Sequence, residues 1–119
     1  MERVDLSDSD LSEANLIGAK LTEISMYRTN LSRANLSQVL LIESYLVEAN
    51  LSESNLTELG VSGRDLRRIN LIRANLTRAG LNAVNMSEAN LFGAILNETY
   101  LDDGIELAGA IMPDGAIHS

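Results

Sequence analysis

Leucine recurs at every fifth residue along most of this chain. Twenty positions follow at that spacing from Leu6 to Leu101, and seventeen of them are Leu, with Met26, Met86 and Val61 at the other three. A helix turns by about 100° per residue and would scatter these side chains around its circumference. A flat strand would send successive leucines to opposite faces, because its side chains alternate with period two. The pattern therefore predicts a solenoid, in which the chain bends at every repeat and each central Leu points to a common axis.

The number of repeats in one coil is indicated by which residues would stack on one another. A spacing of 20 places six pairs of Asn residues in neighbouring coils, against five pairs at 15 and two at 25. The charged residues two positions after each central Leu also alternate in sign at 20, with nine opposite pairs and one like pair. At a spacing of 25 residues the charges alternate nearly as well, so the Asn pairs decide in favour of 20. We predict a stack of coils with four sides each, about five coils in all, and roughly 20 residues per coil, a length found in solenoid repeats.

The strings "SEANLIGAKL", "SRANLSQ", "VEANLSESNL", "IRANLTRAGL" and "SEANLFGAIL" carry a family resemblance. They resemble the A-(D/N)-L-x-x motif of the pentapeptide repeat proteins, from Val4 to about Asp103. This resemblance implies an all-β protein, a right-handed quadrilateral parallel β-helix, in which the central residue and the small residue two positions before it point inward. Short Asn or Asp side chains before the central residue suit the tight turns, since they bond readily to nearby backbone.

The repeat ends near the C-terminus. After Leu101 the next leucine comes six residues later, at Leu107, in a segment that also contains Gly104 and Pro113. We therefore assign residues 1–103 to the β-helix and 104–119 to a C-terminal cap and tail. The string "GAIMPDG" in this tail resembles the C-terminal ends of many cyanobacterial members of the family, which suggests a cyanobacterial source.

Two further positions depart from a simple repeat. Arg64 falls on a slot that is small and inward elsewhere, and an unpaired guanidinium inside the coil would be very costly. We expect a bulge or altered turn to send Arg64 outward. The first coil carries Asp5, Asp8, Asp10 and Glu13 without a preceding cap. Like charges at this edge would discourage end-to-end strand addition; alternatively, a partner or a second copy covers it.

Composition narrows the functional classes. The net charge is −8, from nine Lys plus Arg against seventeen Asp plus Glu, which disfavours nucleic acid and anionic membranes as partners. The chain contains no Cys, and no run approaches the ~18 apolar residues of a membrane span. The N-terminus lacks the apolar region of a signal peptide. We therefore expect a cytoplasmic protein with no nucleic-acid or membrane partner.

The sequence offers no pattern typical of a catalytic site. The single histidine, His118, lies in the tail without a paired carboxylate, and is interpreted as a solvated residue. Asp102 and Asp103 lack the spacing of a calcium loop, and no phosphate-binding or nucleophile motif is present. A narrow solenoid filled by leucine also leaves no room for a substrate. We expect no enzyme, no catalytic residue, no cofactor and no metal.

Two functional classes remain. In the first, the protein is a DNA mimic of the quinolone-resistance type that binds a topoisomerase such as gyrase, as the resemblance to some family members and the acidic charge suggest. The alternating charges, the basic group around Arg64, Arg67, Arg68, Arg73 and Arg78, and the absence of Phe at central positions argue against it. The second class, a structural or protein-interaction module acting through its outer surface, is the one we favour.

The stretch "VLLIESYLV" at residues 39–47 gives this second class a candidate surface. Its apolar residues replace the polar ones found elsewhere between central leucines, and they would meet at one corner of the coil beside an acidic side. Outward aliphatic side chains also suit β-structure as such, so this corner is either a docking site or surface decoration. A smaller candidate is Ile72 stacked under Phe92. We expect a monomer, or a dimer through the open N-terminal coil. The predicted protein-docking residues are Glu23, Tyr27, Leu40, Ile42, Glu43, Tyr45 and Val47.

Overall fold

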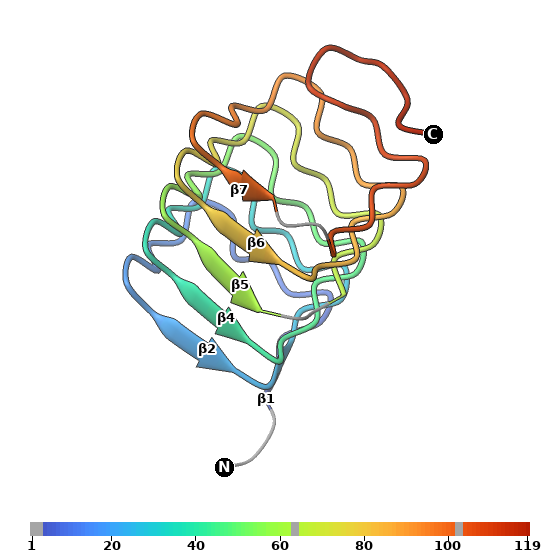
Figure 1. Ribbon diagram of the computed structural model, residues 1–119. Helices are drawn as coiled ribbons and strands as arrows, with labels where there is room; N and C mark the ends of the chain where they lie inside the picture. Colours follow the sequence, from blue (N-terminus) through green and yellow to red (C-terminus); the bar gives the residue numbers. More distant parts are fainter. Residues whose placement is uncertain (1–3, 63–64, 102–103) are drawn as a thin grey trace.

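The chain winds into a stack of parallel coils with its two termini at opposite ends (Figure 1). This computed structural model describes residues 4–62, 65–101 and 104–119, which contain no helix. The rod has extents of 38 × 26 × 24 Å. Its strands are β1 (Val4–Asp5), β2 (Lys20–Thr22), β3 (Ile24–Ser25), β4 (Leu40–Ile42), β5 (Gly60–Ser62), β6 (Gly80–Asn82) and β7 (Tyr100–Leu101).

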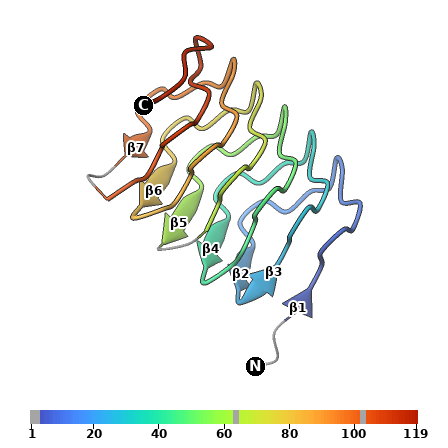
Figure 2. The ribbon, with the colours of Figure 1, turned by 90° about the vertical axis from the view of Figure 1, so that its right-hand side faces the viewer.

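Strand pairing gives the length of a coil. The parallel sheet β2-β4-β5-β6-β7 joins residues 20 apart, as in Leu21↔Leu41 and Leu41↔Val61. The row of five strands forms one side of the stack in both views (Figures 1 and 2). Single parallel bridges such as Asn30↔Asn50 keep the same spacing on the other sides. The predicted four-sided coil is therefore confirmed. We name the sides first to fourth after the central residues of the first coil, which are Leu6, Leu11, Leu16 and Leu21.

The central residues form the core, as predicted. Those from Met26 to Leu91 are at most 4% exposed, and the interior leucines point toward the axis of the coil. The described residues two positions before them are also buried; most are small, such as Ala49 and Ala74 at 0%, although Leu59 fills the same slot at 5%. Where a buried residue in this slot carries a hydroxyl, a backbone carbonyl accepts its hydrogen bond, as from Ser54 Oγ to Leu51 O at 2.6 Å. These inward hydroxyls are therefore satisfied inside an otherwise apolar rod.

The residue before each central position explains why the fourth side is extended and the others bend. On the first three sides this residue is mostly Asn or Asp, whose side chain accepts the N–H of the residue two positions later, as Asn55 does from Thr57 at 3.0 Å. This Asx turn draws the chain out of the extended conformation. The fourth side therefore keeps regular strands and becomes the flat sheet of the molecule. Its residues at this position are Lys20, Leu40, Gly60, Gly80 and Tyr100, which have no such acceptor.

Most repeats also contain a residue in the left-handed region, two positions after the central one. At Glu53, for example, φ is +59°, and the next N–H, of Ser54, donates to Leu51 O at 3.2 Å, which closes a turn. Positive φ at the third residue of the turn is the mark of a type II turn, a position that favours glycine. Most of these positions carry Glu or Arg instead of glycine, so the charged side chains are present despite the strain that positive φ imposes on the backbone.

At this turn position, we expect replacement of a glycine to lower the free energy of unfolding and introduction of a glycine to raise it. Gly18 has φ +73° and open space where a Cβ would lie, so Gly18→Ala should destabilise the fold by about 1 kcal/mol through backbone strain alone. Ala83 has φ +53°, so Ala83→Gly should stabilise the fold slightly. Urea unfolding of both variants provides the measurement. If both changes shift the midpoint in the same direction, the left-handed turns do not limit stability.

The predicted cap begins as a continuation of the coil stack. Glu106 and Ile111 bridge in parallel to Asn85 and Asn90, a step one residue longer than that of the earlier bridges. One extra residue is thus absorbed between the fifth and sixth coils. The chain then folds back, and Ile111 forms an antiparallel bridge with Ile117. This final segment covers only part of the last full coil (Figure 1). The sequence also made specific predictions for Arg64, Asp102 and Asp103, which lie outside the described residues.

Candidate docking surface

The corner predicted from residues 39–47 is built where the second coil passes into the third. Leu40 and Ile42 lie on β4 of the fourth side, where they pair with Gly60 and Ser62 of β5. Leu40 is 41% exposed and Ile42 is half-buried. Because Gly60 has no side chain, Leu40 leans over it, and its Cδ1 lies 3.2 Å from where a Cβ of residue 60 would be.

The adjoining first side contributes a pair of tyrosines. Tyr27 and Tyr45 belong to successive coils, and their rings stack with centroids 6.1 Å apart and an angle of 8° between planes. This separation is within the range of favourable aromatic pairs. Both side chains are half-buried. Of the two, Tyr45 follows Ile42 by three residues, so the pair adjoins β4 at the start of the next side.

Val47 was predicted as part of this corner, and the structure corrects that assignment. It occupies the register position above Tyr27, as predicted, since Arg28 N–H donates to Val47 O at 3.1 Å. Its side chain is nevertheless only 7% exposed, because the column continues with Arg67 in the next coil. Val47 therefore contributes to packing and adds almost nothing to an exposed apolar surface.

The two acidic residues of the prediction lie on the fourth side, at its turn. Glu23 and Glu43 follow β2 and β4 at φ +58° and +53°, and they occupy equivalent positions in successive coils. Glu23 is half-buried and Glu43 is exposed. Glu23 directly follows Thr22 and Glu43 directly follows Ile42, so both acids stand at the turn where the fourth side ends.

The other three sides carry charge ladders. Arg33 lies between Glu13 and Glu53, with N···O distances of 3.3 and 3.8 Å, and Arg73 continues the column at 3.4 Å from Glu53. The predicted alternation of charges between successive coils is thereby confirmed as ion pairs. These groups are largely exposed, and such pairs contribute about 0–1 kcal/mol each. Their main effect is to neutralise the acidic surface locally.

At one position of the ladder on the third side, an amide side chain takes the place of an arginine. Gln38 Nε2 donates to Glu58 Oε1 at 3.0 Å, and Arg78 lies 3.4 Å from the same carboxylate. The hydrogen bond from Gln38, followed by that from Arg78, lowers the pKa of Glu58 below its ordinary value. The carboxylate therefore stays ionised in mildly acidic solution.

A second exposed apolar group, near the C-terminus, was largely missed by sequence reasoning. Phe92 was predicted as part of a smaller candidate with Ile72, and it is 48% exposed, whereas Ile72 is half-buried. Ile95 and Tyr100 stand in columns otherwise occupied mainly by Asn or Gly, a signal that could have identified them. Of the eight exposed large apolar residues in the described parts of the chain, five lie here, namely Phe92, Ile95, Tyr100, Leu101 and Ile117.

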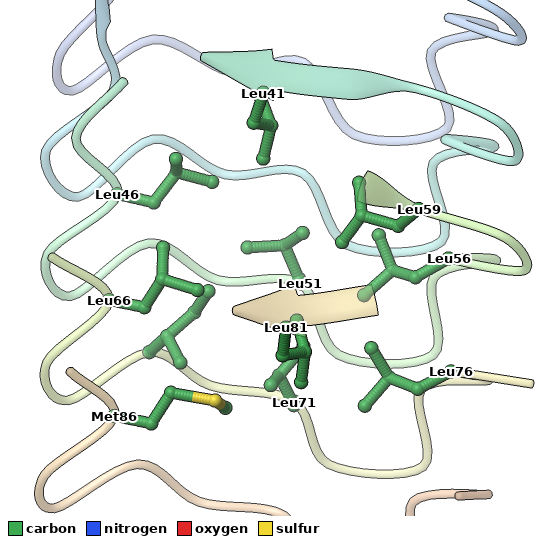
Figure 3. Close-up of a pocket in the computed structure, with 11 residues that line it drawn as sticks. Leu41, Leu46, Leu51, Leu56, Leu59, Leu66, Leu71, Leu76, Leu81 and Met86 are labelled. Atoms are coloured by element: carbon green, nitrogen blue, oxygen red, sulfur yellow. The ribbon is translucent and has the colours of Figure 1, made fainter. Parts of the chain in front are cut away.

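The interior offers no substrate site among the described residues. A cavity of about 20 Å³ in the interior is lined by the apolar residues shown in Figure 3, with no polar atom in its wall. A cavity of this size without polar partners stays dry and holds no substrate. His118 is exposed, and its backbone pairs with Gly109 and Ala110 of the cap. Within the described ranges no three His, Cys, Asp or Glu side chains gather in a metal-binding arrangement.

Stacked parallel coils with a leucine-filled axis and ion-paired sides define a narrow parallel β-solenoid. Within this class the chain belongs to the pentapeptide repeat family, whose model, described as pentapeptide repeats, matches eight copies over residues 1–26, 34–71 and 61–97. No curated protein sequence matches the chain. In the part of the chain that the structure describes, no helix is long and apolar enough to cross a membrane.

Solved structures similar to this chain include two cyanobacterial pentapeptide repeat proteins. Rfr23 of Cyanothece 51142 has 31% identity and a TM-score of 0.83, over 87% of this chain and 84% of its own. HetL of Nostoc sp. strain PCC 7120, involved in heterocyst differentiation regulation, has 29% identity and a TM-score of 0.81. That match covers 99% of this chain, which spans 63% of the length of HetL. The fluoroquinolone resistance protein QnrB1 shares only the fold, with 16% identity and a TM-score of 0.51, over 93% of this chain and 65% of its own.

Proposed function

We propose that this protein is a non-enzymatic interaction module that binds another protein through its outer surface. The observation that carries the proposal is the corner between the fourth and first sides. There, exposed Leu40 lies five residues before Tyr45, whose ring stacks on Tyr27 of the preceding coil, and Glu23 and Glu43 follow β2 and β4 at the turn of the fourth side. The filled interior supports the same conclusion, because it leaves recognition to surface side chains.

The corner has the composition of a protein contact. Apolar patches bordered by polar groups commonly mark interaction sites, and tyrosine is enriched among residues that dominate binding energy. A stacked tyrosine pair is already ordered, so it loses little conformational freedom when a partner binds. We therefore assign Leu40, Ile42 and the tyrosine pair as the contact, with the two glutamates selecting a partner that carries positive charge.

DNA mimicry is the weaker alternative. A DNA mimic requires a continuous negative surface, whereas the ladders on three sides place an arginine next to most acidic rungs. The similarity to QnrB1 concerns the fold and brings no topoisomerase partner with it. HetL is the more relevant precedent, as a family member with a regulatory role.

The proposal predicts that charge introduced at the corner abolishes partner binding. We expect the native protein to retain a partner from a cyanobacterial lysate and the Ile42→Glu, Tyr45→Glu double variant to lose it, because two buried carboxylates would oppose the contact. Ser37→Glu with Ser52→Glu is the matched control, since it adds the same charge on the second and third sides. Circular dichroism verifies that every variant stays folded.

A different result would relocate the site. If Phe92→Glu removes the partner and the corner variant retains it, the contact lies at the C-terminal apolar group. If DNA gyrase is inhibited by the native protein and equally by the corner variant, the interaction-module proposal fails in favour of mimicry.

A further inference from the structure

Among the described residues, the edge of the first coil at the N-terminal end of the rod has backbone groups without a backbone partner. In the second coil, Asn30 and Asn35 N–H donate to carbonyls of the first coil at 2.9 and 2.8 Å. The equivalent N–H groups of Asp10 and Asn15 point away from the stack, and neither donates to any backbone acceptor among the described residues. Free strand edges of this kind are templates for the addition of another strand. Figure 2 shows this edge at the end of the stack where β1 lies.

The same end exposes part of the apolar axis. Leu6, Leu11, Leu16 and Leu21 are half-buried, whereas their equivalents in the second coil are at most 4% exposed. The difference arises because the described residues cover each inner coil on both faces and the first coil on one face only. An added segment would complete the burial of these leucines.

Two of the three charge ladders, on the first and second sides, end here on acids that each pair with a single arginine. An inner rung such as Glu53 lies between two arginines, Arg33 at 3.8 Å and Arg73 at 3.4 Å. Asp8 and Glu13 each pair with one arginine, at 2.9 and 3.3 Å, on the side of the second coil. Their side chains are 63% and 70% exposed toward solvent. Continuation of both ladders requires two cationic side chains five residues apart, because Asp8 and Glu13 occupy neighbouring sides.

A second copy of the chain does not meet this requirement. Two N-terminal ends brought together would oppose Asp8 and Glu13 with the acidic residues of the same edge. A C-terminal end brought against this edge would present Gly109 and Asp114, the last residues of these two columns, and neither supplies a cation. Charge complementarity therefore selects another protein over self-association.

We propose that the open N-terminal coil binds an extended basic segment of a partner protein, which adds as a further coil side. The segment would carry Lys or Arg at two positions five residues apart, opposite Asp8 and Glu13, with Leu between them to cover the exposed axis. Recognition by strand addition derives affinity from backbone hydrogen bonds and specificity from alternate side chains. This second site is independent of the corner and survives if the corner proposal fails.

The chain itself supplies a probe of this site. Its residues 26–40 carry Arg28 and Arg33 and have the sequence "MYRTNLSRANLSQVL". They lie on the N-terminal side of the third coil, which presents Glu48 and Glu53 as the first coil presents Asp8 and Glu13. A blocked, fluorescent peptide of this sequence should bind the protein, measured by anisotropy at low salt. A matched peptide with Arg28→Glu and Arg33→Glu should bind at least about tenfold more weakly, the effect of two ion pairs.

Variants of the protein locate the binding. The Asp8→Asn, Glu13→Gln double variant keeps the shape of both side chains and should weaken peptide binding about tenfold. Glu98→Gln, a comparable exposed acid at the opposite end of a ladder, should leave binding unchanged. Equal binding of the two peptides, equal loss in both protein variants, or absence of binding would each overturn the proposal.

Hydrogen exchange separates strand addition from simple charge attraction. The amides of Asp10, Asn15 and Lys20 should exchange rapidly in the free protein and more slowly, by about tenfold or more, when the peptide is bound. Binding that leaves these three exchange rates unchanged would show that the peptide adheres by charge alone, and strand addition would be excluded.

Discussion

Leu56→Ala should lower the free energy of unfolding by about 2–5 kcal/mol, the range for removal of a buried leucine side chain. Leu56 is 1% exposed and lies at the centre of the rod, with coils on both faces. The rigid backbone turns on either side prevent the wall from collapsing into the space, so both lost burial and a cavity contribute. Urea unfolding followed by circular dichroism measures the loss.

The control for this experiment is the same change at an outward position. Leu40→Ala removes the same atoms from a side chain that is 41% exposed, and it should cost less than half as much. A loss at Leu56 below about 0.5 kcal/mol, the range of ordinary surface substitutions, would contradict its inward assignment.

Ala74→Leu should destabilise the rod by about 1–3 kcal/mol through overpacking. Ala74 is fully buried between successive coils, with its N–H bonded to Leu71 O at 3.0 Å and its carbonyl accepting from Ile95 N–H at 2.9 Å. Asn75 N–H also donates to Ser54 O of the preceding coil at 3.0 Å, so the backbone is held on both faces and resists moving outward to admit three more carbons.

Ser54→Ala is the matched change at an equivalent slot. It preserves the small size of the side chain and removes one hydroxyl hydrogen bond, so it should cost only about 1 kcal/mol. If Ala74→Leu is no more damaging than Ser54→Ala, volume does not restrict this slot in the column of residues 54 and 74.

Sequence reasoning succeeded where the physics is local to one repeat. A leucine every fifth residue, an Asn before it and a small residue one position earlier are each read within a few residues, and they predicted the four-sided coil, the inward leucines and the charge ladders. The extra residue between Leu101 and Leu107 marked the break in register. The flatness of the fourth side was also readable from its lack of Asn acceptors, as at Leu40 and Gly80, although this consequence was not drawn.

Exposure was predicted less well, because it depends on the coils above and below. Val47 has the same outward register as Ile42, yet it is buried beneath its column neighbours. Tyr27 stacks on the ring of Tyr45, although the repeat alone aligns it with Val47. Leu101 occupies a core position and is 40% exposed, since no described segment covers it at the end of the fourth side.

The sequence by itself determined the period and the identity of the core, because a five-residue turn fixes locally which side chain points inward, and the Asn residues 20 apart determined the number of sides. The tertiary structure alone decided which outward side chains remain accessible and which acids have a cation on one face only. Those properties belong to neighbours in successive coils and to the ends of the stack, where a side chain that is covered in every inner coil meets solvent.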